Sequence, residues 1–180
     1  MSITAPRTHP GDTGLITHAT AVVVGGADAD VSVYHARHAN ARIAVVWGGM
    51  LLTLFSAAAA QGLLEGFGAA RQGSLRLPRE IPPPPSMAEA RFARSIVAME
   101  FPYRPTYVVV PQSGPARSGD REIHWVDLHT GPITWQIRDH IGLRSAVALL
   151  KHVHKTAVAV FLDGPAHAED PTVATYRGPK

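Results

Sequence analysis

The segment RIAVVWGGMLLTLFSAAAAQGLLEGFGAAR, residues 42–71, carries no charged side chain between Ile43 and Leu64. Its apolar length is sufficient for a transmembrane helix, since about 20 apolar residues span a bilayer. The pair Gly48-Gly49 near its start favours a different structure, because glycines readily form a tight turn between two strands. The segment therefore predicts either a membrane span or a strand pair followed by a helix.

The second interpretation accounts for more of the pattern. Residues 42–47 place alternate apolar side chains on one face of a strand, and residues 50–55 return as a second strand after the glycine turn. Ser56 stands where β-branched and aromatic residues give way to alanines, so it is predicted to be the N-cap of a helix over residues 57–70. Two further strands are expected upstream, at residues 18–24 and 31–35, paired as a hairpin across a glycine turn.

The same order of elements is predicted again in the second half of the chain. The four strands expected there are residues 94–101, 106–110, 122–128 and 133–137. Asp139 is the expected N-cap of a helix over residues 140–155, which residues 156–162 either prolong or follow with a short extra piece. Residues 121–155 carry acidic and basic side chains throughout, so this copy cannot cross a membrane, and a soluble, cytoplasmic protein is expected.

The chain is thus predicted to be an α+β protein of two β-β-β-β-α repeats, whose antiparallel sheets pack together with one helix each. Residues 52–54 are aligned with residues 133–135 in this comparison. The predicted divisions are a disordered lead-in (1–17), the first repeat (18–70), a proline-rich linker (71–90), the second repeat (91–163) and a loose tail (164–180), with the two repeats sharing one domain.

Several classes of chemistry lack their usual residue patterns. The chain has no cysteine, and its ten histidines form no HExxH motif. The closest histidine pairs, His35 with His38 and His152 with His154, are more typical of exposed or capping histidines than of metal ligands. No GxSxG motif or phosphate-binding glycine loop occurs, and the carboxylates are scattered. We therefore expect no catalytic activity, no cofactor and no metal site.

Aromatic and basic residues are mixed on the predicted strands, and the net charge is +3. Surfaces of this kind hold single-stranded nucleic acid, because bases stack on aromatic rings while arginines neutralise phosphates. The residues predicted to bind are Tyr34, Arg37, Arg42, Arg104, Tyr107, Arg121 and Trp125, together with Arg144, Lys151 and Lys155 on one stripe of the second helix. The alternatives are a core position for each tryptophan and a solvated face for the helix stripe.

Over residues 19–162 this layout resembles the Whirly and PUR-type single-stranded nucleic-acid-binding proteins. The resemblance lies in the two β-β-β-β-α repeats and not in a sequence signature, so the ten residues above rest on their chemistry alone. It implies binding of single-stranded DNA or RNA across the sheets, without metal or catalysis, and assembly into homo-oligomers. Two alternatives stay open: a module that assembles through the apolar helix 57–70, and a membrane-associated accessory protein.

Overall fold

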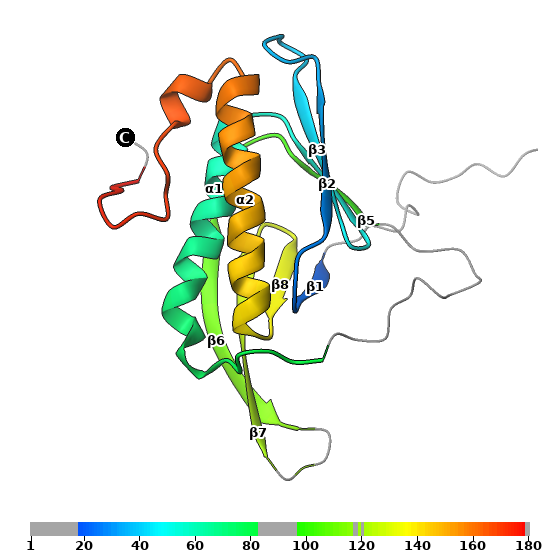
Figure 1. The fold of residues 1–180 in the computed structure, drawn as a ribbon, viewed down its shortest axis with the longest axis vertical. Coiled ribbons are helices and arrows are strands. Elements are labelled where there is room, and N and C mark those ends of the chain that lie inside the picture. Colours follow the sequence, from blue (N-terminus) through cyan, green and yellow to red (C-terminus); the bar gives the residue numbers. More distant parts are fainter. Residues whose placement is uncertain (1–17, 83–96, 117–118, 120, 179–180) are drawn as a thin grey trace, which may run out of the picture.

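The computed structural model describes residues 18–82, 97–116, 119 and 121–178. The first repeat comprises β1 (Ala19–Val23), β2 (Ala29–Tyr34), β3 (Arg42–Trp47), β4 (Met50–Leu54) and α1 (Ala57–Ala69), followed by the 3-10 helix η1 (Ala70–Arg76). The second comprises β5 (Val97–Phe101), β6 (Tyr107–Pro115), β7 (Glu122–Thr130), β8 (Ile133–Ile137) and α2 (His140–Val160), followed by the 3-10 helix η3 (Gly164–His167). The α+β class and the repeated β-β-β-β-α order are confirmed (Figure 1).

The two repeats exchange their first strands. One sheet has the order β1-β8-β7-β6 and the other the order β2-β3-β4-β5. Each exchanged strand pairs in parallel with the strand that leads into a helix, β1 with β8 and β5 with β4. Both sheets are therefore mixed, and the prediction of antiparallel sheets is wrong for these two strand pairs.

The hairpin predicted between residues 18–24 and 31–35 is also wrong, because β1 and β2 belong to different sheets. Alternation of apolar residues defines which face of a strand is buried, but it does not identify the neighbouring strand. In β1, Ala21 lies opposite Trp135 and Val23 opposite Ile137, so β1 extends the buried face of β8. Any strand with two small apolar residues at alternate positions meets that requirement.

The strand registers show how the two repeats correspond. Leu54 pairs with Phe101 in one sheet, as Ile137 pairs with Val23 in the other. Residues 50–54 therefore correspond to residues 133–137, which differs from the alignment predicted from the sequence. The correspondence continues into the helices, because the N-caps Ser56 and Asp139 each lie two residues after the end of the preceding strand, β4 or β8.

Both predicted helix caps are confirmed. The Ser56 hydroxyl accepts a hydrogen bond from the Ala59 N–H at 3.1 Å, and the Asp139 carboxylate accepts one from the Gly142 N–H at 2.6 Å. Such caps satisfy backbone donors that the first turn of a helix leaves without partners. At its other end α2 reaches Val160, so residues 156–160 prolong the helix.

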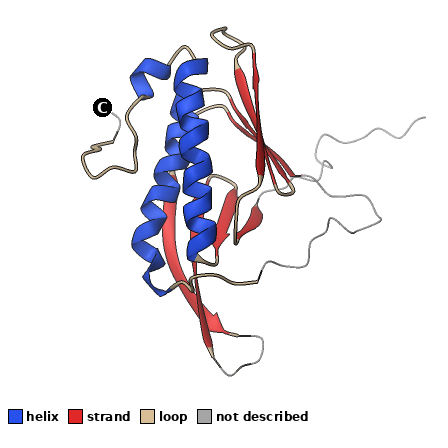
Figure 2. Ribbon diagram, in the orientation of Figure 1, coloured by secondary structure: helices blue, strands red, loops and turns tan. Residues whose placement is uncertain are grey.

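The uncharged segment is divided among β3, β4 and α1, and both helices lie side by side against one face of the sheets (Figure 2). The side chains of Leu63, Leu64 and Phe67 are buried inside the chain. Within the described part of the chain, no helix combines the length and apolar character that a bilayer crossing requires. The apolar residues of α1 thus complete the core of this chain and leave no broad apolar stripe for a partner.

Three aromatic rings from both repeats meet at the centre of that core. The indole rings of Trp47 and Trp135 stack with their centroids 5.4 Å apart, and the Phe67 ring meets Trp135 edge-on at 5.3 Å. Offset or edge-on aromatic pairs add to the stabilisation that burial itself provides. The two sheets and α1 therefore share one core.

The segments predicted as a linker and a tail pack against the helices where the structure describes them. In the tail, the Glu169 carbonyl accepts a hydrogen bond from Gln61 Nε2 of α1 at 2.9 Å, and just before it the Asp163 carboxylate accepts from Ala57 N–H and Ala58 N–H at 3.0 and 3.1 Å, which adds a second cap to α1. On the linker side, the Pro78 carbonyl accepts from the His140 N–H at 3.0 Å. Residues 71–82 and 164–178 are thus attached to the fold, whereas the lead-in 1–17 and linker residues 83–90 lie outside the described residues.

Candidate nucleic-acid interface

Each sheet has one face against the helices and one that no described element covers. On the sheet of β7, Leu128 and Trp135 are buried on the helix side, whereas Val22 and Val108 on the other side are 55% and 60% exposed. We call this uncovered side the β7 face. Its outward residues are Thr20, Val22, Val108, Val110, Ile123, Trp125, Asp127, His129, Thr134 and Gln136, with Arg138 at the end of β8.

An aromatic–arginine pair stands at one end of the β7 face. The Arg138 guanidinium carbon lies 4.8 Å from the centroid of the Trp125 ring, and Arg138 Nε donates to Gln136 Oε1 at 2.9 Å. A cation over an indole ring is attracted by the negative face of the ring. On β6, Gly114 lies beside the indole, and a Cβ there would be at ordinary contact distance, 3.4 Å, from the Trp125 ring. The pair therefore has Gln136 of β8 and Gly114 of β6 as its neighbours.

Two polar atoms, one in this pair and one next to it, have no hydrogen-bond partner among the described residues. Within the described residues, Trp125 Nε1 and Asp127 Oδ1 are shielded from solvent and make no hydrogen bond. Leaving a buried donor or acceptor unpaired costs about 1–3 kcal/mol. One donor and one acceptor on successive outward positions of β7 thus have unused hydrogen-bonding capacity, which a ligand reaches only if the surrounding side chains shift.

A chain of polar side chains crosses the same face further along β7. His129 Nδ1 lies 2.7 Å from Thr134 Oγ1, which in turn lies 2.9 Å from His18 Nε2. The links join β7, β8 and the residue before β1. The β7 face therefore combines rings, an arginine and polar groups with exposed valines at its edges.

The other sheet has a related arrangement on its uncovered side, which we call the β3 face. The Arg42 guanidinium carbon lies 4.8 Å from the centroid of the Tyr34 ring. Arg42 and Trp125 occupy equivalent positions in the two repeats. Each comes directly before a residue, Ile43 or Val126, that holds the same register position in its sheet. Both uncovered faces thus carry an aromatic–arginine pair that includes the same position of the central strand, although the second member comes from β2 in one sheet and from the end of β8 in the other.

The β3 face is less suited to an anion than the β7 face. Asp30 and Glu100 occupy outward positions on β2 and β5, and both are exposed. The predicted residue Arg37 lies in the turn after β2, where its N–H donates to the Val160 carbonyl at 2.7 Å and its Nη1 to the Phe161 carbonyl at 3.2 Å. Arg37 therefore fixes this turn to the end of α2.

Arg104 and Tyr107, predicted as binding residues, belong to a network inside the fold. Arg104 forms an ion pair with Glu65 on α1, and it donates to Gln61 Oε1 at 2.7 Å and to the Tyr176 hydroxyl at 3.0 Å. The Tyr107 hydroxyl donates to Glu65 Oε1 at 3.3 Å. These contacts join α1, β6 and the C-terminal segment, so a structural role accounts for both residues.

The Tyr107 network predicts a loss of stability in alkaline solution. Burial raises the pKa of Tyr107 above its ordinary value of 10.0, and the Glu65 carboxylate raises it further. Because the folded protein holds this proton more tightly than the unfolded chain, the stabilisation is complete below pH about 10 and declines as the pH rises further. Urea unfolding between pH 8 and 11, followed by circular dichroism, is expected to show this decline in the parent protein and a smaller one in Tyr107→Phe. Parallel pH profiles for the two proteins would contradict it.

The basic stripe on α2 lies on a different side of the molecule from the two uncovered faces, because the helices cover the opposite face of the sheets (Figure 1). Arg144 and Lys155 are exposed, whereas Lys151 Nζ is 3.0 Å from an Asp170 carboxylate oxygen. Burial raises the pKa of the Asp170 carboxyl, but hydrogen bonds from Thr172 and the charge of Lys151 lower it by more. The pKa of Asp170 is therefore below its ordinary value of 3.8. Lys151 therefore helps to attach the C-terminal segment.

The ten predicted residues are therefore distributed over separate surfaces. Trp125 shares the β7 strand region with the exposed Arg121, which precedes β7 at the far end of the β6–β7 ribbon. The sequence prediction missed Arg138, the partner of Trp125. A signal was present, since Thr134, Gln136 and Arg138 continue the polar alternation of the last strand up to the helix cap.

Comparison of the chain with protein-family models, curated proteins and solved structures finds no match in any of the three. Within the described residues, no group of three histidine, aspartate or glutamate side chains is arranged to hold a metal ion. The aromatic–arginine pair on the β7 face is thus the arrangement with the clearest capacity to hold a ligand.

Proposed function

We propose that the chain binds single-stranded nucleic acid on the β7 face, without catalysis. The observation that carries this proposal is the Trp125–Arg138 pair on a sheet face that no described element covers. Indole rings and guanidinium planes both stack on unpaired bases, and an arginine also neutralises phosphate charge. A base stacked on the pair would place the neighbouring sugar–phosphate backbone of the nucleic acid close to the sheet surface.

The rest of the face supports this assignment. Arg121, just before β7, and Trp125 and His129 within it recur at every fourth residue, a spacing of about 13 Å for an extended strand. Polar groups between them offer donors and acceptors to base edges, as single-stranded recognition requires. The similarity of the repeat order to Whirly and PUR-type proteins supports the same function, as does the second aromatic–arginine pair on the β3 face.

The test is a titration of fluorescein-labelled oligo-dT with the parent protein and three variants, followed by anisotropy at about 50 and about 200 mM salt. Trp125→Ala is expected to weaken binding about tenfold or more, because stacking contributes about 1–3 kcal/mol per base. Arg138→Ala is expected to weaken binding and to lower the salt dependence by about one counterion. Tyr34→Ala on the β3 face is the control, with a smaller effect.

Two results would overturn the proposal. One is an absence of binding at low salt, and the other is unchanged affinity in Trp125→Ala when circular dichroism shows that the variant is folded. Assembly into a homo-oligomer, which the resemblance implies, stays a prediction, and light scattering on the ligand-free protein tests it.

A further inference from the structure

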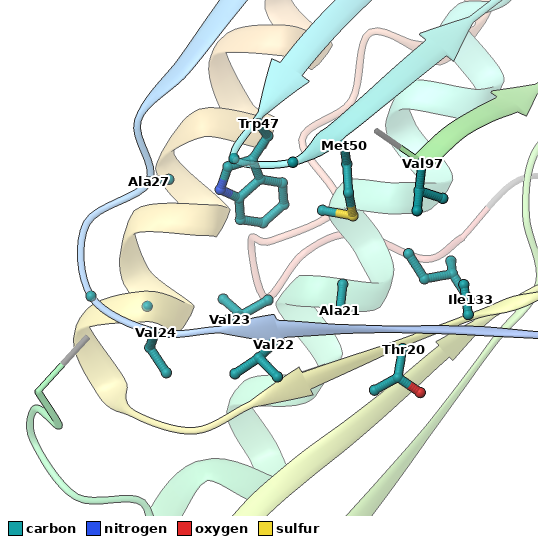
Figure 3. Close-up of a pocket in the computed structure, with 15 residues that line it drawn as sticks. Thr20, Ala21, Val22, Val23, Val24, Ala27, Trp47, Met50, Val97 and Ile133 are labelled. Atoms are coloured by element: carbon teal, nitrogen blue, oxygen red, sulfur yellow. The ribbon is translucent and has the colours of Figure 1, made fainter. Parts of the chain in front are cut away.

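An apolar cleft of about 450 Å³ lies between the two sheets. Its walls are the inward side of β1, the turn between β3 and β4, and the start of β5. Figure 3 shows Ala21 and Val23 pointing from β1 toward Trp47 and Met50 across the cleft, while Thr20 and Val22 point to the other side of the strand. The cleft thus opens where the two exchanged strands, β1 and β5, approach each other.

The lining selects an uncharged occupant. No charged side chain contributes to the cleft among the described residues, and the walls are mainly valine, alanine, glycine, methionine and tryptophan. A cavity of about 150 Å³ already holds a benzene molecule, so this volume has room for more than one apolar side chain. Single-stranded nucleic acid, with a charge at every phosphate, does not fit such a lining.

A second feature of the site is the outer edge of β1, which presents backbone hydrogen-bonding groups beside the cleft. β1 is an edge strand of its sheet, and β8 is its only strand partner within the described residues. Along its other edge, the backbone N–H and C=O groups of Thr20 and Val22 make no hydrogen bond with another described segment. An unpaired strand edge is a template for a further strand, whose main chain supplies hydrogen bonds while its alternate side chains enter pockets.

We propose that an extended segment of a partner protein adds to the free edge of β1 and places alternate apolar side chains in the cleft. Side chains of an added strand alternate between the two faces of a sheet, so every second one would share the side of Ala21 and Val23. The free edge requires a peptide backbone, and the apolar walls require residues such as valine at alternate positions. This site is separate from the β7 face and does not depend on nucleic-acid binding.

The experiment uses a synthetic, terminally blocked peptide of alternating valine and threonine, with binding followed by tryptophan fluorescence and calorimetry. Ala21→Phe, which fills the cleft, is expected to weaken binding by at least about tenfold. Ala148→Phe is the matched control, because it makes the same substitution at an exposed position of α2, away from the cleft and from the edge of β1, and it is expected to change affinity by less than about twofold. Oligo-dT binding by Ala21→Phe should be unchanged.

Two N-methylated peptides test the strand pairing on the parent protein itself, so the result stands even if Ala21→Phe fails to fold. Methylation of one set of alternate amides removes the donors that face β1, whereas methylation of the other set leaves them intact. One peptide is therefore expected to bind and the other to fail. Equal binding of the two, absence of peptide binding, or binding of decanoate in place of the peptide would overturn the proposal.

Discussion

Asp139→Ala is expected to lower the free energy of unfolding by about 3–5 kcal/mol, because the fully buried carboxylate satisfies backbone donors from three segments. It accepts from the Gly142 N–H of α2 at 2.6 Å, from the Ile81 N–H at 3.0 Å and from the Gly25 N–H at 3.3 Å. Alanine would leave all three donors without this partner, and the Gly142 donor is buried. The urea midpoint, followed by circular dichroism, measures the loss.

Ser56→Ala is the matched control, because Ser56 holds the corresponding cap position in the first repeat. Its expected cost is about 1 kcal/mol, the usual value for an N-cap. Asp163 also caps α1, so the loss of the Ser56 hydroxyl leaves other donors satisfied. Equal losses in Asp139→Ala and Ser56→Ala would show that Asp139 acts as a helix cap alone and does not join the three segments.

Trp135→Ala is expected to cost about 3–5 kcal/mol, the range for large aromatic residues deleted from a core. Its side chain is fully buried between Trp47 and Phe67, and its indole N–H donates to Thr130 Oγ1 at 2.8 Å. The variant would leave a cavity at the junction of both sheets and an unpaired hydroxyl acceptor. Denaturant unfolding and near-ultraviolet circular dichroism, which reports the stacked indoles, measure the effect.

Trp125→Ala provides the contrast for this prediction, because it removes the same side chain from the uncovered face. Its expected effect on the free energy of unfolding is within about 1 kcal/mol, as for most partly exposed positions. A comparable destabilisation by both variants would mean that Trp125 is a core residue, and it would remove the basis for a ligand site on the β7 face.

Local features of the fold could be predicted from the sequence, whereas strand partners could not. Ser56 and Asp139 were identifiable as caps, because each stands between a strand pattern and a helix pattern. The position of β1 was not, because its partner β8 is remote in the sequence and the Gly25 N–H meets the Asp139 carboxylate across 114 residues. Parallel pairing at that separation leaves no mark on local alternation.

The candidate site was predictable only in part, for a related reason. Trp125 was predicted as a binding residue, and it faces outward on β7. Arg104 has the same chemistry as Arg138, yet it is held by Glu65 while Arg138 covers an indole. An arginine in a sequence does not indicate whether a carboxylate or a ring will lie beside it.

The exchange of first strands has a consequence for how the chain acquires its fold during synthesis. β1 is synthesised before the other described strands, whereas its partner β8 is the last of them to be made. The first repeat alone can form the β2-β3-β4 meander, but β1 has no β8 to pair with until the second repeat has been synthesised. The same connectivity, cut between the repeats, is that of a domain-swapped dimer.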